Sequence, residues 1–223
     1  MDEEPPSVEA AVRAGAALFT DGYVLAAHDP WEAAWLPLDA SSSDPIEAAD
    51  ERLLHGLIAI SAATHHARSR NWSGAVGCAE NGVKYLSSVD DRHRRVHVSP
   101  LREWARRLAA DPDVIDRDMP PDVRVSDTRL GFSDLDFDAT MLAAPALADA
   151  LDRRDSARDS AGRSTLEQAV ALARDERNTA QTTVTELVFA FCRVPNARPQ
   201  IRARLADHVD RAERKRRDVE DLF

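Results

Sequence analysis

The stretch from Pro45 to Arg68 constrains the fold more than any other part of the sequence. Apolar residues lie around much of its helical circumference, namely Leu53, Leu54, Leu57, Ile58, Ile60 and Ala62. A helix that is apolar on most sides has to be covered by other helices. Asp44 can cap this helix, and Pro45 suits its first position because that residue needs no N–H. The sequence therefore predicts a buried helix from Pro45 to Arg68 inside a helical bundle.

The rest of the chain offers further helical patterns and no strand pattern of any length. The expected helices are Val8 to Phe19, Tyr23 to Leu36, Gly74 to Leu86, Leu101 to Ala109, Leu135 to Leu151, Ser164 to about Cys192 and Ile201 to Phe223. Ser164 and Glu167 have the spacing of a capping box. Residues 90–100 are expected to be a linker and 111–130 an irregular crossing. The predicted fold is all-α, a compact helical bundle with a C-terminal helical extension.

The length of 223 residues suits one large domain with an appended helical lobe. We expect residues 1–121 to form a core domain and residues 122–223 to form a helical extension packed on it.

The charge balance is acidic and poor in lysine. The net charge is −10, and Lys84 and Lys215 are the only lysines. Carboxylates hold water in concentrated salt, whereas long lysine stems expose methylene groups. The composition therefore predicts a halophilic protein. A negative surface also repels nucleic acid and anionic lipid, so we expect neither as a partner.

Three features favour a soluble, cytoplasmic protein. Cys78 and Cys192 lie far apart and form no ligand-spaced pair, which suits a reducing compartment better than a disulfide. The acidic start MDEEPPS lacks the order of a signal peptide. No apolar run nears the ~20 residues that a membrane span needs.

The ten residues AAHDPWEAAW concentrate unusual side chains. On a continuous helix, His28, Trp31, Glu32 and Trp35 share one face. Because indoles are normally buried, we expect the imidazole and the carboxylate to turn inward and pair with each other or with nearby polar groups. Pro30 must kink the helix or begin it. If Asp29 caps the helix instead, His28 lies just outside it.

Several motifs occur in a fixed order. They are F-x-x-G-x-x-x-x-A-H-D-x-W-E-x-x-W from Phe19 to Trp35, L-H-G-L-I from Leu54 to Ile58, His65-His66, and N-W-x-G-A from Asn71 to Ala75. Together they resemble the domain-of-unknown-function family 309, in its haloarchaeal branch, over roughly Phe19 to Leu86. The resemblance implies a compact helical fold and no established activity. Ala26 and Ala59 stand where the family often has an acid and a glutamine, so two potential polar partners are missing.

The histidines and the glutamate are possible metal ligands: His28, Glu32, His55 and His65 or His66. His55 and His66 share one helix face but lie ~16 Å apart along it, so both cannot bind one ion. There is no H-E-x-x-H motif and no paired Glu-x-x-His. We therefore predict neither a metal nor another cofactor, and we favour hydrogen-bonded side chains that fix the packing of the helices.

Three further patterns have simple explanations. Asp136 to Thr140 matches the phosphatase motif DxDxT. Because the surroundings of this motif are helical, we attribute the match to chance. The cluster AERKRRD near the C-terminus is interleaved with acids and lacks aromatics, which indicates a solvated, ion-paired helix face. NWSGAVGCAENGVKYL resembles half of a tetratricopeptide hairpin, yet no ~34-residue period repeats.

The first functional hypothesis is an uncharacterised helical module that binds a partner protein or regulates one. The alternative is a small-molecule-binding protein or hydrolase, with or without a metal, in which His28 and Glu32 are the catalytic residues. The supporting pocket or structural residues are then Trp31, Trp35, Arg52, His55, His65, His66 and Asn71. The sequence leaves open whether the protein is an enzyme, what it binds and its oligomeric state.

Overall fold

The computed structural model describes residues 5–154, 161–177 and 182–220. The chain forms two compact units, Met1–Ala139 and Thr140–Phe223. The predicted division into residues 1–121 and 122–223 separates the family-like part of the sequence from its C-terminal extension. That division stays a prediction.

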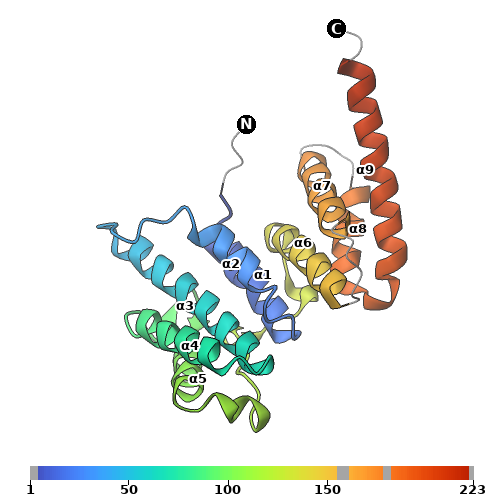
Figure 1. Cartoon of the computed structure of the whole chain (residues 1–223). Coiled ribbons are helices and arrows are strands. Elements are labelled where there is room, and N and C mark those ends of the chain that lie inside the picture. Colours follow the sequence, from blue (N-terminus) through green and yellow to red (C-terminus); the bar gives the residue numbers. More distant parts are fainter. Residues whose placement is uncertain (1–4, 155–160, 178–181, 221–223) are drawn as a thin grey trace. The chain divides into compact units, whose positions relative to one another are not determined.

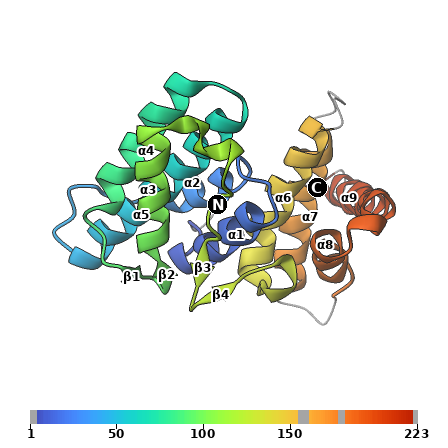
Figure 2. The ribbon, with the colours of Figure 1, turned by 90° about the horizontal axis from the view of Figure 1, so that it is seen from below.

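The first unit is built on five helices: α1 (Val8–Thr20), α2 (His28–Trp35), α3 (Pro45–Arg68), α4 (Trp72–Leu86) and α5 (Val98–Ala110). Helix α3 lies between α2 and α4, and α5 packs on α4 (Figures 1 and 2). The predicted central helix is confirmed at both ends. The Asp44 carboxylate accepts a hydrogen bond from the Ile46 N–H at 2.8 Å, and Pro45 is the first helical residue. The all-α prediction is also confirmed.

Two glycines let α3 and α4 approach closely. A Cβ atom at Gly56 would lie 2.3 Å from Cδ2 of Leu86, and one at Gly82 would lie 3.1 Å from Cγ1 of Ile60. Leu86 and Ile60 are buried. The glycine of L-H-G-L-I therefore makes room for a leucine of the next helix, which gives that motif a packing role.

The motif N-W-x-G-A forms the turn from α3 into α4. The Asn71 side chain accepts a hydrogen bond from the Gly74 N–H at 3.1 Å and so caps α4. Its backbone N–H donates to the carbonyl of His66 at 2.9 Å, and Arg70 has a positive φ of 59°. These bonds satisfy groups that helix ends leave unpaired.

The segments expected to lack regular structure contain two small hairpins. Strands β1 (Arg92–His93), β2 (Val96–His97), β3 (Arg124–Val125) and β4 (Thr128–Arg129) form an antiparallel sheet in that order (Figure 2). Short 3-10 turns span Pro112–Asp116 and Phe132–Asp134. The expectation of a plain linker and an irregular crossing was therefore wrong in part.

Both hairpin turns have two residues in the left-handed region. The φ angles are 46° at Arg94, 63° at Arg95, 52° at Ser126 and 64° at Asp127. Two-residue hairpin turns with positive φ normally use glycine or asparagine. Neither turn contains those residues, so no turn motif in the sequence indicated the hairpins.

The second unit is formed by α6 (Phe137–Arg154), whose first turn precedes the boundary, together with α7 (Ala161–Glu176), α8 (Thr183–Arg193) and α9 (Arg198–Glu220). Helices α7, α8 and α9 contact one another. A 3-10 turn at Pro195–Ala197 separates α8 from α9. The DxDxT match has a structural role, since the Asp136 carboxylate accepts a hydrogen bond from the Ala139 N–H at 3.0 Å.

The expected long helix from Ser164 to Cys192 is two helices. The Glu176 carboxylate at the end of α7 accepts hydrogen bonds from the backbone N–H groups of Val184 at 3.1 Å and Thr185 at 2.9 Å. Glu176 thereby caps α8. Its hydrogen bonds satisfy backbone N–H groups that the break between α7 and α8 would leave unpaired. The predicted capping box was also wrong, because α7 begins at Ala161 and Ser164 lies inside it.

An arginine closes the end of α8. Arg198 is buried and donates hydrogen bonds to the carbonyls of Phe191 at 3.0 Å and Cys192 at 3.3 Å. Arg202 on α9 pairs with Asp152 on α6 at 2.6 Å. Within the described ranges, every helix is too short or too polar to cross a membrane.

Candidate functional site

Trp31 packs on α1 and is fully buried. A Cβ atom at Gly15 would lie 2.2 Å from the indole Nε1, and the ring centroid of Phe19 lies 6.3 Å from that of Trp31. The Nε1 atom is buried and has no hydrogen-bond partner within the part of the chain that the structure describes. Trp31 is therefore a core residue that depends on the absence of a side chain at Gly15.

His28 and Glu32 form a pair, but the pair is not in the core. Nδ1 of His28 lies 3.5 Å from Oε2 of Glu32, and the two side chains are 26% and 44% exposed. The expectation that both groups turn inward was therefore wrong. Helix α2 begins at His28 and buries Pro30, Trp31 and Ala34. Glu32 does not belong to this buried face of α2. His28, Trp31, Glu32 and Trp35 therefore lie in different environments.

Trp35 belongs to a second group of side chains, built on α3 and α4. The indole Nε1–H of Trp35 donates to Oε1 of Glu51 at 2.9 Å, and Nδ1 of His55 lies 3.2 Å from the same oxygen. The His55 ring stacks on Tyr85 with a centroid distance of 3.7 Å and an interplanar angle of 18°. The ring centroid of Trp35 lies 4.6 Å away from that of His55. Two aromatic rings and a carboxylate thus fix the imidazole.

The buried carboxylate determines which nitrogen of His55 carries the proton. Glu51 is 6% exposed, and an ionised carboxylate only accepts hydrogen bonds. The Nδ1–H of His55 is therefore the donor, and a neutral ring keeps its lone pair on Nε2. The side chain of His55 is 28% exposed.

Asp50, the neighbour of Glu51, holds the first hairpin against α3. Its side chain is 5% exposed and accepts from Nε of Arg94 at 2.7 Å, from Nη2 of Arg94 at 2.5 Å and from Nε2 of His93 at 2.7 Å. The hydrogen bond to Asp50 raises the pKa of Arg94. Because a buried charge needs a partner, this bidentate pair anchors the strained turn.

The remaining predicted residues lie elsewhere on α3 or, for Asn71, at the start of α4. Nδ1 of His66 lies 3.2 Å from the Asn71 side-chain nitrogen, and the rings of His65 and His66 are 5.9 Å apart. Arg52 forms no ion pair or hydrogen bond with residues in the described ranges.

The predicted site residues therefore fall into separate groups: the pair of His28 and Glu32, the cluster around His55, and the turn at Asn71. Among the described residues, no three His, Cys, Asp or Glu side chains are grouped as a metal site requires. The structure adds Asp50, Glu51, Tyr85, His93 and Arg94, which the sequence reading missed. One signal for them was present, because Glu51 and His55 are four residues apart on the same helix and so lie on one face of it.

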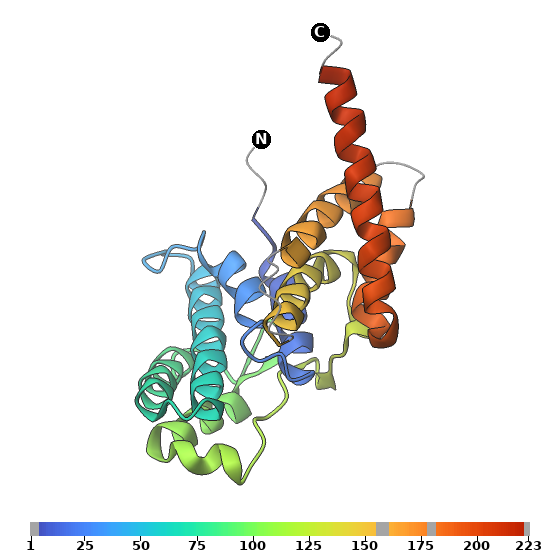
Figure 3. The same ribbon diagram turned by 45° about the vertical axis from the view of Figure 1, so that its right-hand side comes forward.

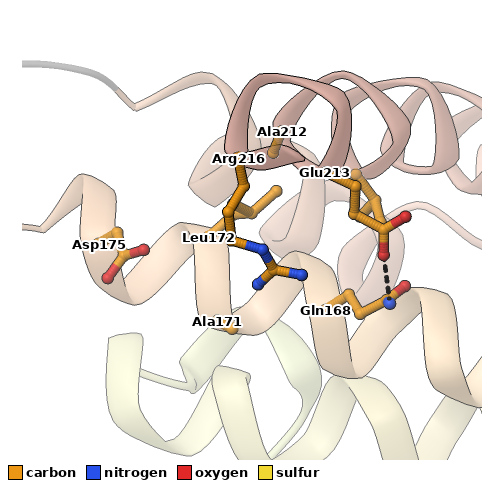
Figure 4. Close-up of a pocket in the computed structure, with 8 residues that line it drawn as sticks. Gln168, Ala171, Leu172, Asp175, Ala212, Glu213 and Arg216 are labelled. Carbon is orange, nitrogen blue, oxygen red and sulfur yellow. Dashed lines mark hydrogen bonds between the residues drawn. The ribbon is translucent and has the colours of Figure 1, made fainter. Parts of the chain in front are cut away.

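The second unit contains a groove between α7 and α9, with a volume of about 340 Å³ (Figure 4). Its apolar lining comes from both helices: Ala171, Leu172, Val209 and Ala212. Val209 is buried, Leu172 and Ala212 are half-buried, and Ala171 is exposed. Apolar surface is therefore open to solvent along this groove.

Polar side chains border the groove. Gln168 donates a hydrogen bond to Glu213 across it at 2.8 Å, and Asp175 and Arg216 also line it (Figure 4). An apolar floor with a polar border is typical of a surface that binds another molecule.

The fold and these two sites define a helical module with a partly buried polar cluster in one unit and an open groove in the other. Residues 12–78 match the family model described as Domain of unknown function (DUF309). That range contains the cluster residues Trp35, Glu51 and His55 and stops before Tyr85 and the groove. No curated protein and no solved structure matches the chain.

Proposed function

We propose that this protein is a non-enzymatic helical module that binds a partner protein through the α7–α9 groove. The open apolar lining of that groove is the observation that carries the proposal. Apolar residues of two helices with polar residues around them form a concave surface that another molecule can cover. A groove between two helices suits the apolar side of a helical segment.

The polar residues of the first unit support a structural role there. Glu51 already accepts hydrogen bonds from Trp35 and His55, and Asp50 is held by Arg94 and His93. Carboxylates with two or more hydrogen-bond partners fix the packing of the helices and the hairpin.

We also propose the setting in which the module works. The acidic, lysine-poor composition supports a haloarchaeal branch of the family and a salt-rich cytoplasm. It also supports the absence of nucleic-acid partners.

A selection from a displayed peptide library tests the binding function. The unmodified full-length protein is the target. The Leu172→Asp variant is used for counter-selection, which removes peptides that bind outside the groove. Ala203→Asp is the matched control, because it adds the same charge at an exposed position of α9 outside the groove. We expect binders with apolar residues at helical spacing that recognise the Ala203→Asp protein and lose the Leu172→Asp protein.

Ala171→Trp provides a second test, because Ala171 is exposed and a large ring there fills the groove without disturbing the core. Binders that ignore both groove variants, or a selection that enriches no helical pattern, would contradict the proposal.

An alternative function uses the partly exposed pair of His28 and Glu32 as an acid–base site, with or without a metal. The observation in its favour is their 3.5 Å separation with partial exposure of both groups. Its test is hydrolysis of p-nitrophenyl esters, with metal analysis of the purified protein. Activity or stoichiometric metal that is lost in His28→Ala, while the fold is kept, would favour this alternative over the binding module.

A further inference from the structure

We infer that the partner segment is an amphipathic helix with acidic residues beside its apolar face. This inference rests on the proposed binding function and specifies the chemistry of the partner.

The shape of the groove suits a helix. Its lining residues on α7 are Gln168, Ala171, Leu172 and Asp175, and on α9 they are Val209, Ala212, Glu213 and Arg216. Each set follows the spacing i, i+3, i+4, i+7, so one face of each helix borders the groove. Eight residues of helix span about 11 Å, which is about two turns. A partner helix therefore presents two or three apolar side chains to a groove of this length.

The charge at the end of α9 selects acidic partners. Residues 211–217 contain five cations, Arg211, Arg214, Lys215, Arg216 and Arg217, and one acid, Glu213. Figures 1 and 3 show α9 continuing beyond α7 and α8, so this basic end projects from the second unit. One of the five, Arg216, also lines the groove, together with the acids Asp175 and Glu213, and Glu213 is hydrogen-bonded to Gln168. In a chain of net charge −10, this concentration of positive charge is unusual.

The cations are not neutralised by the acids between them. Arg211 and Arg214 donate to the backbone carbonyls of Asp207 at 2.8 Å and Asp210 at 3.1 Å. Lys215, Arg216 and Arg217 form no ion pair with residues in the described ranges. The ion pairs expected with Asp210, Glu213 and Asp218 are therefore not formed among the described side chains, whereas Glu220 and Asp221 lie outside them. Glu213, the acid in the centre, accepts a hydrogen bond from Gln168 instead.

A protein partner fits these residues better than a nucleic acid does. The groove lining includes no aromatic side chain on which a base could stack. Apolar floor and adjacent cations match a helix that carries both leucine and glutamate side chains.

Binding of three synthetic peptides to the full-length protein tests the inference by fluorescence anisotropy. The peptides have about 18 residues and the same leucine stripe, and their other positions carry Glu, Gln or Lys. In about 0.2 M KCl we expect the Glu peptide to bind about 10-fold more tightly than the Gln peptide, and the Lys peptide to bind most weakly.

Arg216→Glu should remove the preference for the Glu peptide. Arg204→Glu makes the same charge change at an exposed position of α9 outside the groove and should keep the preference. Ala171→Trp should weaken all three peptides.

The outcomes separate the inference from the proposed function. Equal binding of the three peptides that is lost in Ala171→Trp would overturn the acidic partner and leave the groove function standing. Binding of none would overturn both. Binding of the Glu peptide that persists in Ala171→Trp would show surface charge attraction alone, and stronger binding of a DNA duplex would show a nucleic-acid surface. Either result overturns the inference.

Discussion

At the scale of single residues, Trp31 occupies space that the small residue at position 15 leaves free. The indole lies where a side chain at Gly15 would have to be, since the closest distance is 2.2 Å. Gly77, on α4, has open space around its Cα atom and is exposed. The two helical glycines therefore have opposite roles, although both raise the conformational freedom of the unfolded chain.

We predict that Gly15→Ala lowers the free energy of unfolding by about 1–3 kcal/mol, because the added methyl group displaces the indole. Gly77→Ala should raise it by about 0.5–1 kcal/mol, since alanine restricts the unfolded chain and favours the helix. Urea unfolding measures both changes in the free energy of unfolding, provided that the variants have the same dependence of this free energy on urea concentration. Equal effects of the two substitutions would show that Trp31 tolerates a side chain at position 15.

The two cysteines differ in burial. Both are free thiols, and burial raises the pKa of Cys192 to about 12 and raises that of the half-buried Cys78. The thiolate is the reactive form of cysteine. Cys192 therefore stays protonated in the folded protein at pH values where an unfolded chain begins to ionise.

We predict that a thiol reagent at about pH 8 labels Cys78 first and labels Cys192 only after unfolding. Because the folded pKa of Cys192 is raised, its contribution to stability is complete below the unfolded value of about 8.5 and is lost as the pH rises towards 12. Mass spectrometry of labelled peptides checks the order. Equal labelling rates in the native protein would contradict the burial of Cys192.

At the scale of secondary-structure elements, the sequence predicted what depends on local periodicity and capping. Asp44, Pro45 and the apolar pattern define α3 to the residue. The break between α7 and α8 depends on a tertiary cap, in which Glu176 reaches backbone groups nine or fewer residues ahead, and no local pattern indicates it. The pairing of His28 with Glu32 followed from spacing, whereas its exposure depends on which edge of α2 meets α1.

The two hairpins depend on side-chain contacts that compensate for unfavourable turns. Arg92 forms two hydrogen bonds with Asp127, at 3.1 and 2.9 Å, and the Ser126 N–H donates to the carbonyl of Arg95 at 2.8 Å. The turn of one hairpin is thus bound to the other hairpin. Left-handed φ costs about 1–2 kcal/mol for a residue with a side chain.

We predict that Arg95→Gly stabilises the protein by about 0.5–1 kcal/mol, because glycine adopts a φ of 63° without strain. Asp127→Gly relieves the same strain but removes the hydrogen bonds from Arg92, so it should stabilise less or destabilise. Thermal unfolding of the two variants measures the difference. A larger gain from Asp127→Gly would show that the contact between the hairpins contributes little.

At the scale of the whole molecule, negative charge opposes the compact state. A net charge of −10 produces self-repulsion, which dissolved salt screens. Composition predicted this property without reference to the fold. The groove, in contrast, could not be predicted, because it requires the break after α7 and the packing of α7 on α9.

We predict that the thermal midpoint rises as KCl increases from about 0.1 M to 2 M, because screening reduces the repulsion. A variant with Glu80→Gln, Asp90→Asn and Asp207→Asn should have a higher midpoint at low salt and a smaller rise. These three acids are exposed and form no ion pairs within the described ranges. A midpoint that falls with KCl would argue against a halophilic protein.

The contact of Leu86 with the backbone of Gly56 links two positions thirty residues apart in sequence. A relative with a larger residue at position 56 has to carry a smaller one at position 86, or the two helices must separate. These positions should consequently change together during evolution, so an alignment of related sequences tests the packing of α3 on α4 without any purified protein.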